Sequence, residues 1–497
     1  MKLSGLLFAA ALLGSCTQPA AEENYTRHVD PKIGTGGHGH VFVGANVPFG
    51  LVQVGPTSIP QTWDWCSGYH ASDSTVIGFS HTHLSGTGIG DLFDITVMPV
   101  VGEVTYARGE ENDPASGLWS YADRTREITK PGYYSVPLVR YGITAELTAT
   151  ERVGLHRYTF PASDAAAVVF DLENGGCWDK ATDTGFRFSD DSTRIAGWRC
   201  STGWAKNQEV YFVAEFSKPA KGISYLQPGE IDDSKMPRIA ARYARVDFDT
   251  AEGEQVLVKV ALSPVSIEGA KANLAAELPG WDFDATAAAA DKAWNDELSK
   301  VKIETEDETS KRIFYTALYH TMVAPSLFCD VNGDYRGADG KVHENPGRDT
   351  YTTFSLWDTY RAAMPLMTVL HPERMPDIIQ TMLHIADEQG RLPVWHLWGN
   401  ETDCMVGNPG IVAVADAIVK GIGGFDREKA FETIRKTAMN PDRGNGLRME
   451  YGYIPCEMFN EAVAYDMEYA LADGAAARAA EALGLSLIHI SEPTRPL

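Results

Sequence analysis

The sequence has few cysteines, a shortage of basic residues, and no long hydrophobic run after its first sixteen residues. None of the seven cysteines forms a CxxC pair, so we expect no zinc ribbon. The 43 Lys and Arg residues are outnumbered by 67 Asp and Glu residues, and a net charge of −24 would repel nucleic acid. No later stretch is long and apolar enough to predict a transmembrane helix. What remains is a globular chain of 497 residues, which suggests roughly two to four domains.

The first sixteen residues form a predicted signal peptide. Lys2 supplies positive charge, and the apolar run 6–13 is too short to cross a bilayer as a mature helix. The run ends in LGSC, which resembles the lipobox of bacterial lipoproteins. This resemblance implies cleavage before Cys16, acylation of its thiol, and residues 17–24 as a tether. We therefore expect a lipid anchor in the bacterial cell envelope, on the periplasmic or cell-surface side of the outer membrane. The alternative is an ordinary signal peptide with an incidental cysteine. An exported location also permits disulfides among the other cysteines, whose pairing stays open.

Residues 25–280 are predicted to form an N-terminal β-sandwich domain. Residues 142–150 alternate apolar and polar side chains, which is the period of a half-buried strand. Gly, Pro and Asn-rich breaks separate this segment from other short strand candidates, as expected for a sandwich. Those candidates are residues 166–170, 211–216 and 255–262.

Helical patterns follow the β-rich part. Residues 281–302 are alanine-rich and predict a helical linker, and residues 303–484 predict a partial (α/α)6 catalytic barrel. Apolar residues between positions 378 and 386 recur on one helical face, and Gly390 is a plausible stop. Further helices are expected at 411–422, 427–439 and 461–483. The predicted fold is therefore a multidomain β + α protein, a β-sandwich followed by an incomplete barrel. Residues 485–497 lack matching periodicity and resemble translated sequencing-adaptor DNA, so we expect a non-native tail.

A carboxylic acid, Glu401, lies in a segment rich in aromatic residues, with Trp398 and Asn400 just before it. Both are candidate sugar contacts, because an indole offers a flat face for the C–H face of a sugar. Aromatic surroundings solvate a carboxylate poorly and favour the protonated acid. Such an acid can donate to a leaving-group oxygen, as glycoside hydrolysis requires. The alternative is a buried aromatic cluster whose Glu caps a helix.

Two further clusters could bind a sugar. Trp63, Asp64 and Trp65 alternate aromatic and polar groups and could line a sugar subsite, or they could form the edge of the sandwich core. Asp358 and Arg361 lie one helical turn apart, beside Trp357, and could pair with each other. The functional alternative has Asp358 accepting hydrogen bonds from sugar hydroxyls while Arg361 fixes its orientation.

Three motifs are predicted to be structural. Residues 34–39 satisfy GxGxxG, but no helix follows, so tight turns are expected rather than a dinucleotide site. His81 and His83 would share one face of a strand and could hold a metal, but a hydrogen-bonded structural pair is favoured. Asp330 begins a segment like a calcium loop, which then departs from the EF-hand pattern and reads as a polar turn.

Taken together, six segments resemble family-92 glycoside hydrolases, the calcium-dependent exo-acting α-mannosidases. The resemblance implies a β-sandwich packed on an (α/α)6 barrel, and single-displacement hydrolysis of terminal α-mannosides of glycans with inversion. It also implies Glu401 as general acid and a calcium ion, for which Asn460 is the candidate ligand. The segments are residues 29–36, 63–70, 78–90, 355–361, 399–405 and 451–457.

The sequence departs from the family pattern in two places. The family's general base is an Asp well downstream of the acid, and no matching segment occurs between Glu401 and residue 484. We therefore expect the chain as printed to be inactive, since inversion needs that second carboxylate. Residues 407–410 also differ, which leaves the leaving-group subsite open, with Cys456 and Glu457 as candidate contributors. The alternatives are a non-catalytic carbohydrate-binding lipoprotein and another (α/α)6 enzyme, such as a phosphorylase or glucosidase.

Overall fold

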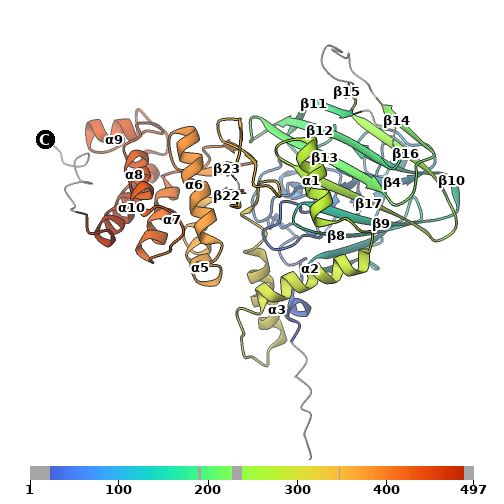
Figure 1. The fold of residues 1–497 in the computed structure, drawn as a ribbon, viewed down its shortest axis with the longest axis horizontal. Coiled ribbons are helices and arrows are strands. Elements are labelled where there is room, and N and C mark those ends of the chain that lie inside the picture. The colour runs from blue at the N-terminus through green and yellow to red at the C-terminus, as the bar shows by residue number, and fades with distance from the viewer. Residues whose placement is uncertain (1–22, 188–191, 227–237, 346, 486–497) are drawn as a thin grey trace, which may run out of the picture.

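A β-rich body and a helical body lie side by side in the structure, a computed structural model (Figure 1). The structure describes residues 23–187, 192–226, 238–345 and 347–485. Cys16, with the predicted lipid anchor, and nearly all of the predicted tail lie outside this part. Within it, every helix is too short or too polar to cross a membrane.

Two antiparallel sheets pack face to face and form the sandwich. Alternating side chains of β8 are buried, because one face of each sheet meets the core. Phe170 from one sheet stacks on Phe212 from the other, with ring centroids 5.9 Å apart. The four strands expected from the sequence lie within β8, β10, β13 and β17. One sheet has the order β1 (Gly55–Thr57), β3 (Gly78–Ser80), β4 (Thr96–Val101), β10 (Ser163–Asp171), β16 (Tyr243–Thr250), β14 (Gly222–Leu226); the other has the order β15 (Arg238–Ile239), β11 (Lys180–Arg187), β12 (Arg194–Thr202), β13 (Gln208–Phe216), β17 (Glu254–Ser263), β9 (Val153–Phe160), β8 (Ile143–Ala149), β7 (Tyr133–Leu138), β6 (Ile128–Lys130).

Short elements decorate the sandwich. A two-stranded ribbon and three 3-10 turns lie in its long connections, where Gly and Pro interrupt the strand pattern. The ribbon pairs β2 (Thr75–Val76) with β5 (Ser120–Tyr121), and the turns are η1 (Tyr25–His28), η2 (Trp63–Trp65) and η3 (Pro114–Ser116).

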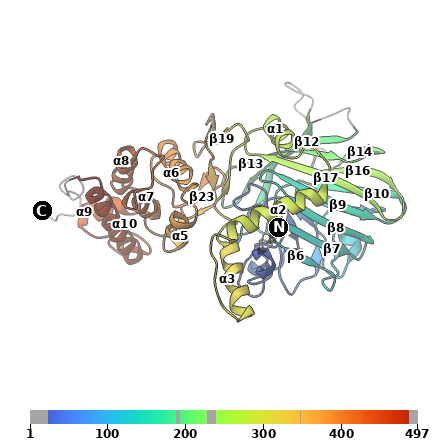
Figure 2. The ribbon, with the colours of Figure 1, turned by 60° about the horizontal axis from the view of Figure 1, so that its bottom comes forward.

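Three helices cover the sandwich and lead to the second body: α1 (Ile267–Glu277), α2 (Phe283–Leu298) and α3 (Glu308–His320). Each begins at a Ser or Asp whose side chain accepts a backbone N–H, which satisfies one of the free donors of the first turn. The helix α2 falls in the predicted linker and packs on the sandwich, where the indole of Trp294 donates to the carbonyl of Asn46 over 2.7 Å. Figure 2 shows α2 lying across the ends of β6 to β9.

The helical body contains the remaining helices and the small sheets between them. Gly390 ends α6 with φ of 93°, so the predicted stop is confirmed, because glycine reaches this left-handed conformation without strain. Small residues of α10, including Ala472 and Ala476, are buried in the packing of the helices. The helices are α4 (Leu356–Thr359), α5 (Ala363–Leu370), α6 (Met375–Gln389), α7 (Pro409–Val419), α8 (Arg427–Ala438), α9 (Asn445–Tyr451) and α10 (Ala462–Ala482); the strands pair β18 (Ser326–Leu327) with β21 (Tyr351–Thr352), β19 (Tyr335–Arg336) with β20 (Val342–His343), and β22 (Phe354–Ser355) with β23 (Trp395–Leu397) and then β24 (Asn400–Glu401).

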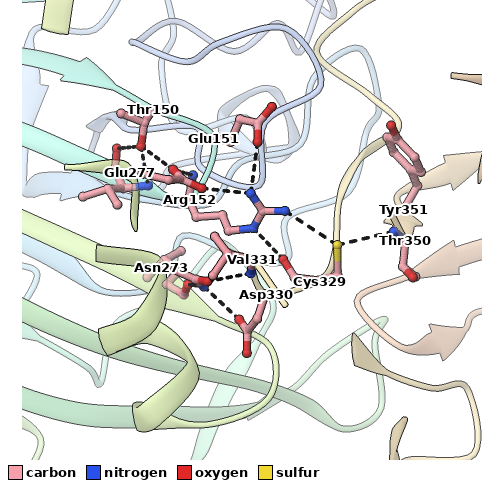
Figure 3. A network of polar contacts seen from close by, with 12 residues as sticks. Thr150, Glu151, Arg152, Asn273, Glu277, Cys329, Asp330, Val331, Thr350 and Tyr351 are labelled. Carbon is pink, nitrogen blue, oxygen red and sulfur yellow. Dashed lines mark hydrogen bonds and ion pairs between the residues drawn. The ribbon is translucent and has the colours of Figure 1, made fainter. Parts of the chain in front are cut away.

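A buried polar network joins the two bodies (Figure 3). Arg152, at the start of β9, donates from Nε to the carbonyl of Cys329 over 2.7 Å and from Nη1 to Oε1 of Glu277 over 2.8 Å. Asp330 accepts from the amide of Asn273 over 2.8 Å. Burial raises the pKa of Asp330 to about 6. The carboxylate of Asp330, which would be a ligand in a calcium loop, accepts a hydrogen bond from Asn273 instead. The polar turn predicted at Asp330 is therefore part of the domain joint.

Candidate active site

A small cleft of about 160 Å³ opens where the two bodies meet. The sandwich contributes the loop Ser85 to Thr87, and the end of α3 contributes His320. The helical body contributes Asp358 and Trp395. Residues from both bodies therefore line one cavity, whose lining is more apolar than polar, and a cleft between two domains is a common position for a binding site.

Asp358 is an exposed carboxylate in this cleft. Its Oδ2 accepts a hydrogen bond from Oγ of Ser355 over 2.7 Å. Arg361 takes a different partner, since its Nη2 lies 2.6 Å from Oε1 of Glu468 on α10. Glu468 also accepts from the hydroxyl of Tyr360 over 2.8 Å, and its hydrogen bond raises the pKa of Arg361. The local Asp358–Arg361 pair considered from the sequence is replaced by a long-range pair, which leaves Asp358 available to a ligand.

Glu401 lies beside the cleft, in the hairpin of β23 and β24. Its Oε2 accepts from the amide of Val394 over 2.8 Å, and its Oε1 accepts from the amides of Trp395 over 2.9 Å and Asp403 over 3.0 Å. The carboxyl therefore stabilises the hairpin, and it does not cap a helix, as the alternative from the sequence had it. The side-chain amide of Gln389 also lies 3.4 Å from Oε2, so the carboxyl has to exchange one of these four contacts before it donates a proton to a substrate.

The aromatic residues near Glu401 are mostly buried. Trp398 is 2% exposed and packs on Phe328 with ring centroids 5.3 Å apart, so its faces are covered by protein. The sugar-stacking role predicted for Trp398 is therefore corrected to a core role, because no face remains for a sugar. Asn400 is also engaged, since its amide bonds to the backbone of Asn207 and to the carbonyl of Trp398. Trp395 is the aromatic residue of this segment that lines the cleft.

Backbone strain occurs in these loops as well as in the sandwich. Among the described non-glycine residues with positive φ, six belong to loops of the helical body around the cleft and the Glu401 hairpin. Each such conformation costs about 1–3 kcal/mol and persists where surrounding structure enforces it, often at functional sites. The six are Thr353, Trp398, Asp403, Met405, Arg443 and Glu461, with φ between 47° and 73°.

The Trp63 segment lies next to the cleft on the sandwich side. Trp63 is 48% exposed, and its indole donates to the carbonyl of Gly88 over 2.8 Å, one residue beyond the loop that lines the cleft. Asp64 has Oδ1 2.5 Å from Nδ1 of His38. Trp65 donates to Oδ2 of Asp73 over 2.7 Å, so its indole supports the loop. Of the three predicted sugar contacts, Trp63 presents a free aromatic surface.

Comparison with known proteins identifies the family. The model of the glycosyl hydrolase family 92 N-terminal domain matches residues 28–263, and the model of the family 92 catalytic domain matches residues 269–489. The chain belongs to glycosyl hydrolase family 92. The family-92 α-mannosidase BT3965 from Bacteroides thetaiotaomicron is 37% identical, with a TM-score of 0.90 over 95% of this chain and 63% of that one.

Two further family-92 relatives differ more. The inverting mannosidase BT2199 from the same bacterium is 28% identical, with a TM-score of 0.81 over 95% of this chain and 64% of its own. An uncharacterized secreted glycosidase of Arthroderma benhamiae is 25% identical over 91% of this chain and 58% of its own. The chain thus spans less than two thirds of the length of these relatives.

The glycine and histidine motifs of this family-92 chain make contacts within the sandwich, but His81 and His83 have different partners and do not form the predicted pair. A Cβ on Gly39 would lie 1.8 Å from the carbonyl oxygen of Gly34, so the glycines permit a close turn. His81 pairs with His156 across 2.9 Å between their Nε2 atoms, whereas His83 bonds to the carbonyl of Gln53. Burial lowers the pKa of His81 to about 4 and that of His83 to about 3. The described cysteines from Cys66 onward are free thiols.

Two sets of residues are candidate calcium ligands, the group around Glu297 and the predicted Asn460. Glu297, His371 and Glu373 lie close enough to share a metal, but the ammonium of Lys300 occupies their centre, 2.7 Å and 2.9 Å from the two carboxylates. A cation is therefore already present there. Asn460 is exposed on the connection between α9 and α10. The candidate group at Glu297 does not include Asn460, and calcium takes 6–8 oxygen ligands, so the described residues do not by themselves fit the ion.

Sequence reasoning missed two residues of the site. Glu468 orients Arg361 from 107 positions away, and no local pattern could have indicated this pair. A Cβ on Gly407 would lie 2.5 Å from Cβ of Glu468, so this glycine allows the close approach of α10. His320 lines the cleft, and burial lowers its pKa to about 4, so it is neutral at neutral pH. Cys456 and Glu457 are exposed and stay predictions as subsite residues.

Proposed function

We propose that this protein is an exo-acting α-mannosidase that removes terminal mannose from glycans. The proposal rests on the small cleft between the two family-92 domains. In this cleft the exposed carboxylate of Asp358 accepts a hydrogen bond from the hydroxyl of Ser355. The cleft has a volume of about 160 Å³ and is lined by residues of both domains.

The proposed roles follow from position. Asp358 accepts hydrogen bonds from hydroxyls of the bound sugar, Arg361 stacks over the ring of Trp357 next to Asp358, and Trp63 offers an apolar face at the sandwich side. Glu401 donates its proton to the departing oxygen after releasing a backbone N–H. Inversion further requires a second carboxylate, acting as the base, about 6.5–9.5 Å from the acid.

The test compares the Glu401→Gln variant with the unsubstituted protein. Mannose release from α-mannobiose is measured for each, and mannose binding is followed by tryptophan fluorescence. We expect Glu401→Gln to lower hydrolysis by about 10²–10⁴-fold while binding persists, since general acids contribute that much. Hydrolysis unaffected by Glu401→Gln would refute the assignment of the acid.

The alternatives give different results. A carbohydrate-binding lipoprotein would bind mannose in both forms and hydrolyse in neither. Another barrel glycosidase or a phosphorylase would prefer a glucoside or require phosphate. Calcium dependence is proposed because enzymes of family 92 are generally calcium-dependent. A chelator should abolish hydrolysis, and added calcium should restore it.

We also propose that Cys16 anchors the protein in a bacterial envelope membrane. Support comes from the lipobox-like LGSC sequence alone. Cys16→Ala should move the protein from the membrane fraction to the soluble fraction, and radiolabelled palmitate should label the wild type only. Labelling of the variant would contradict the proposal.

A further inference from the structure

The turn between β12 and β13, residues 203–207, reaches from the sandwich to the hairpin that carries Glu401. The amide of Asn207 donates to Oδ1 of Asn400 over 3.0 Å, and Nδ2 of Asn400 donates back to the carbonyl of Asn207 over 3.0 Å. The ring of Trp204 meets that of Trp395 with centroids 5.0 Å apart. One turn therefore contacts both strands of the hairpin, through Trp395 on β23 and Asn400 on β24.

The same turn is fixed to the interior of the sandwich. The amide of Ala205 donates to Oδ2 of the buried Asp91 over 2.9 Å, and the amide of Gly203 closes the turn on the carbonyl of Ala205. Gln208, the next residue after the turn, bonds to Asp94 in the core. The turn is therefore rooted in buried structure, although Asn207 at its contact with the hairpin is exposed.

The contact is suited to orienting the hairpin. Asn400 directly precedes Glu401, and its amide also donates to the carbonyl of Trp398 over 2.8 Å, across the turn of the hairpin. The amide of Trp395 is itself one of the donors to Glu401. Both residues held by the sandwich thus connect directly to the carboxyl of Glu401.

We propose that residues 203–207 are a positioning element that sets the orientation of Glu401 through Asn400 and Trp395. This inference rests on the proposed role of Glu401 as the acid. It assigns Asn400 a positioning role in place of the sugar contact predicted from the sequence. The catalytic hairpin is then correctly placed when the sandwich is docked against it.

The first experiment needs no activity. Hydrogen exchange by mass spectrometry is measured on the full chain for the peptide covering residues 392–403, in Asn400→Ala, Trp204→Ala and the control Lys206→Ala. Lys206 is an exposed neighbour in the same turn. We expect the first two variants to speed exchange in this peptide by roughly tenfold or more, because the contacts that close the hairpin are lost. Helix α6 and strand β17 should exchange as in the wild type, and the control should match the wild type throughout.

The second experiment separates positioning from stability. In hydrolytically active protein, Asn400→Ala should lower kcat/KM for methyl α-mannoside by about tenfold or more, and for 2,4-dinitrophenyl α-mannoside by less than about threefold, because a good leaving group needs little help from the acid. Unchanged exchange in both variants, acceleration spread evenly over the whole chain, or equal loss on both substrates would overturn the proposal. Absence of any mannoside hydrolysis would instead count against the proposed function, and the exchange result would stand.

Discussion

The protonation state of Asp91, which accepts a hydrogen bond from the turn at residues 203–207, can be tested directly. Asp91 is 1% exposed, and Oδ1 has no hydrogen-bond partner among the described residues. Burial raises the pKa of Asp91 from 3.8 to about 6, with Asp179 and Asp94 adding to the rise and the amides of Ala205 and Trp204 opposing it. The folded protein therefore holds a proton on Asp91 at pH values where the unfolded chain has lost it.

The sign and size of the effect follow from this shift. A raised carboxyl pKa stabilises the fold below the unfolded pKa, and this contribution is lost as pH rises through about 6. A shift of about two units corresponds to about 3 kcal/mol between pH 4 and pH 7. Asp91→Asn keeps an oxygen for the amide of Ala205 but cannot ionise. Relative to wild type, the variant should therefore gain up to about 3 kcal/mol in free energy of unfolding on going from pH 4 to pH 7.5.

Urea denaturation followed by tryptophan fluorescence at several pH values measures this difference. The matched control is Glu103→Gln, which removes an exposed carboxylate of the same domain. The control should run parallel to wild type over the same range. A constant difference between Asp91→Asn and wild type from pH 4 to pH 7.5 would show that Asp91 is ionised in the fold throughout, and would refute the reasoning.

Three further substitutions probe the site and the domain joint. Glu468→Gln should raise KM for a mannoside about twofold to fivefold with little change in kcat, since the half-exposed Arg361 loses a pair worth about 0.2–1 kcal/mol; a large fall in kcat would contradict this. Gly88→Ala places a Cβ 2.5 Å from the Trp63 ring, so acrylamide quenching should rise and mannose binding weaken, while the free energy of unfolding changes by less than about 1 kcal/mol. Arg152→Met should cost about 3–5 kcal/mol in urea denaturation, because it leaves a partly buried carboxylate unpaired; unchanged stability would count against the joint.

The parts of the fold that were predictable are those with local causes. Alternation over residues 142–150 depends on which face of a strand meets the core, and β8 follows it. Gly390 could be identified because a helix that ends in a left-handed residue favours glycine. The close turn at Gly34 and Gly39 belongs to the same class, since only the absent side chains permit it.

The site was less predictable because its contacts are distant in sequence. Asp358, a candidate from the sequence, does line the cleft, but the partner of Arg361 is Glu468, on a helix more than a hundred residues away. The aromatic residues around Glu401 do cluster, but Trp398 is buried in the core and contributes to packing. Composition indicates that an indole is present, whereas the direction in which it faces is set by tertiary contacts.

The strained loops of the helical body show why the site needs its surroundings. Asp403, Met405 and Arg443 all have positive φ, a conformation that costs each residue about 1–3 kcal/mol when isolated. Contacts from elsewhere hold them: Nη1 of Arg443 donates to the carbonyl of Gly407 over 2.6 Å, and the hydroxyl of Tyr469 on α10 donates to the carbonyl of Arg443 over 2.8 Å. The sandwich turn supports the hairpin from the other side. Geometry that no segment would adopt alone is therefore maintained jointly by α10 and the sandwich, and loosening either support should disorder the loop after Glu401 before it unfolds the helices beneath.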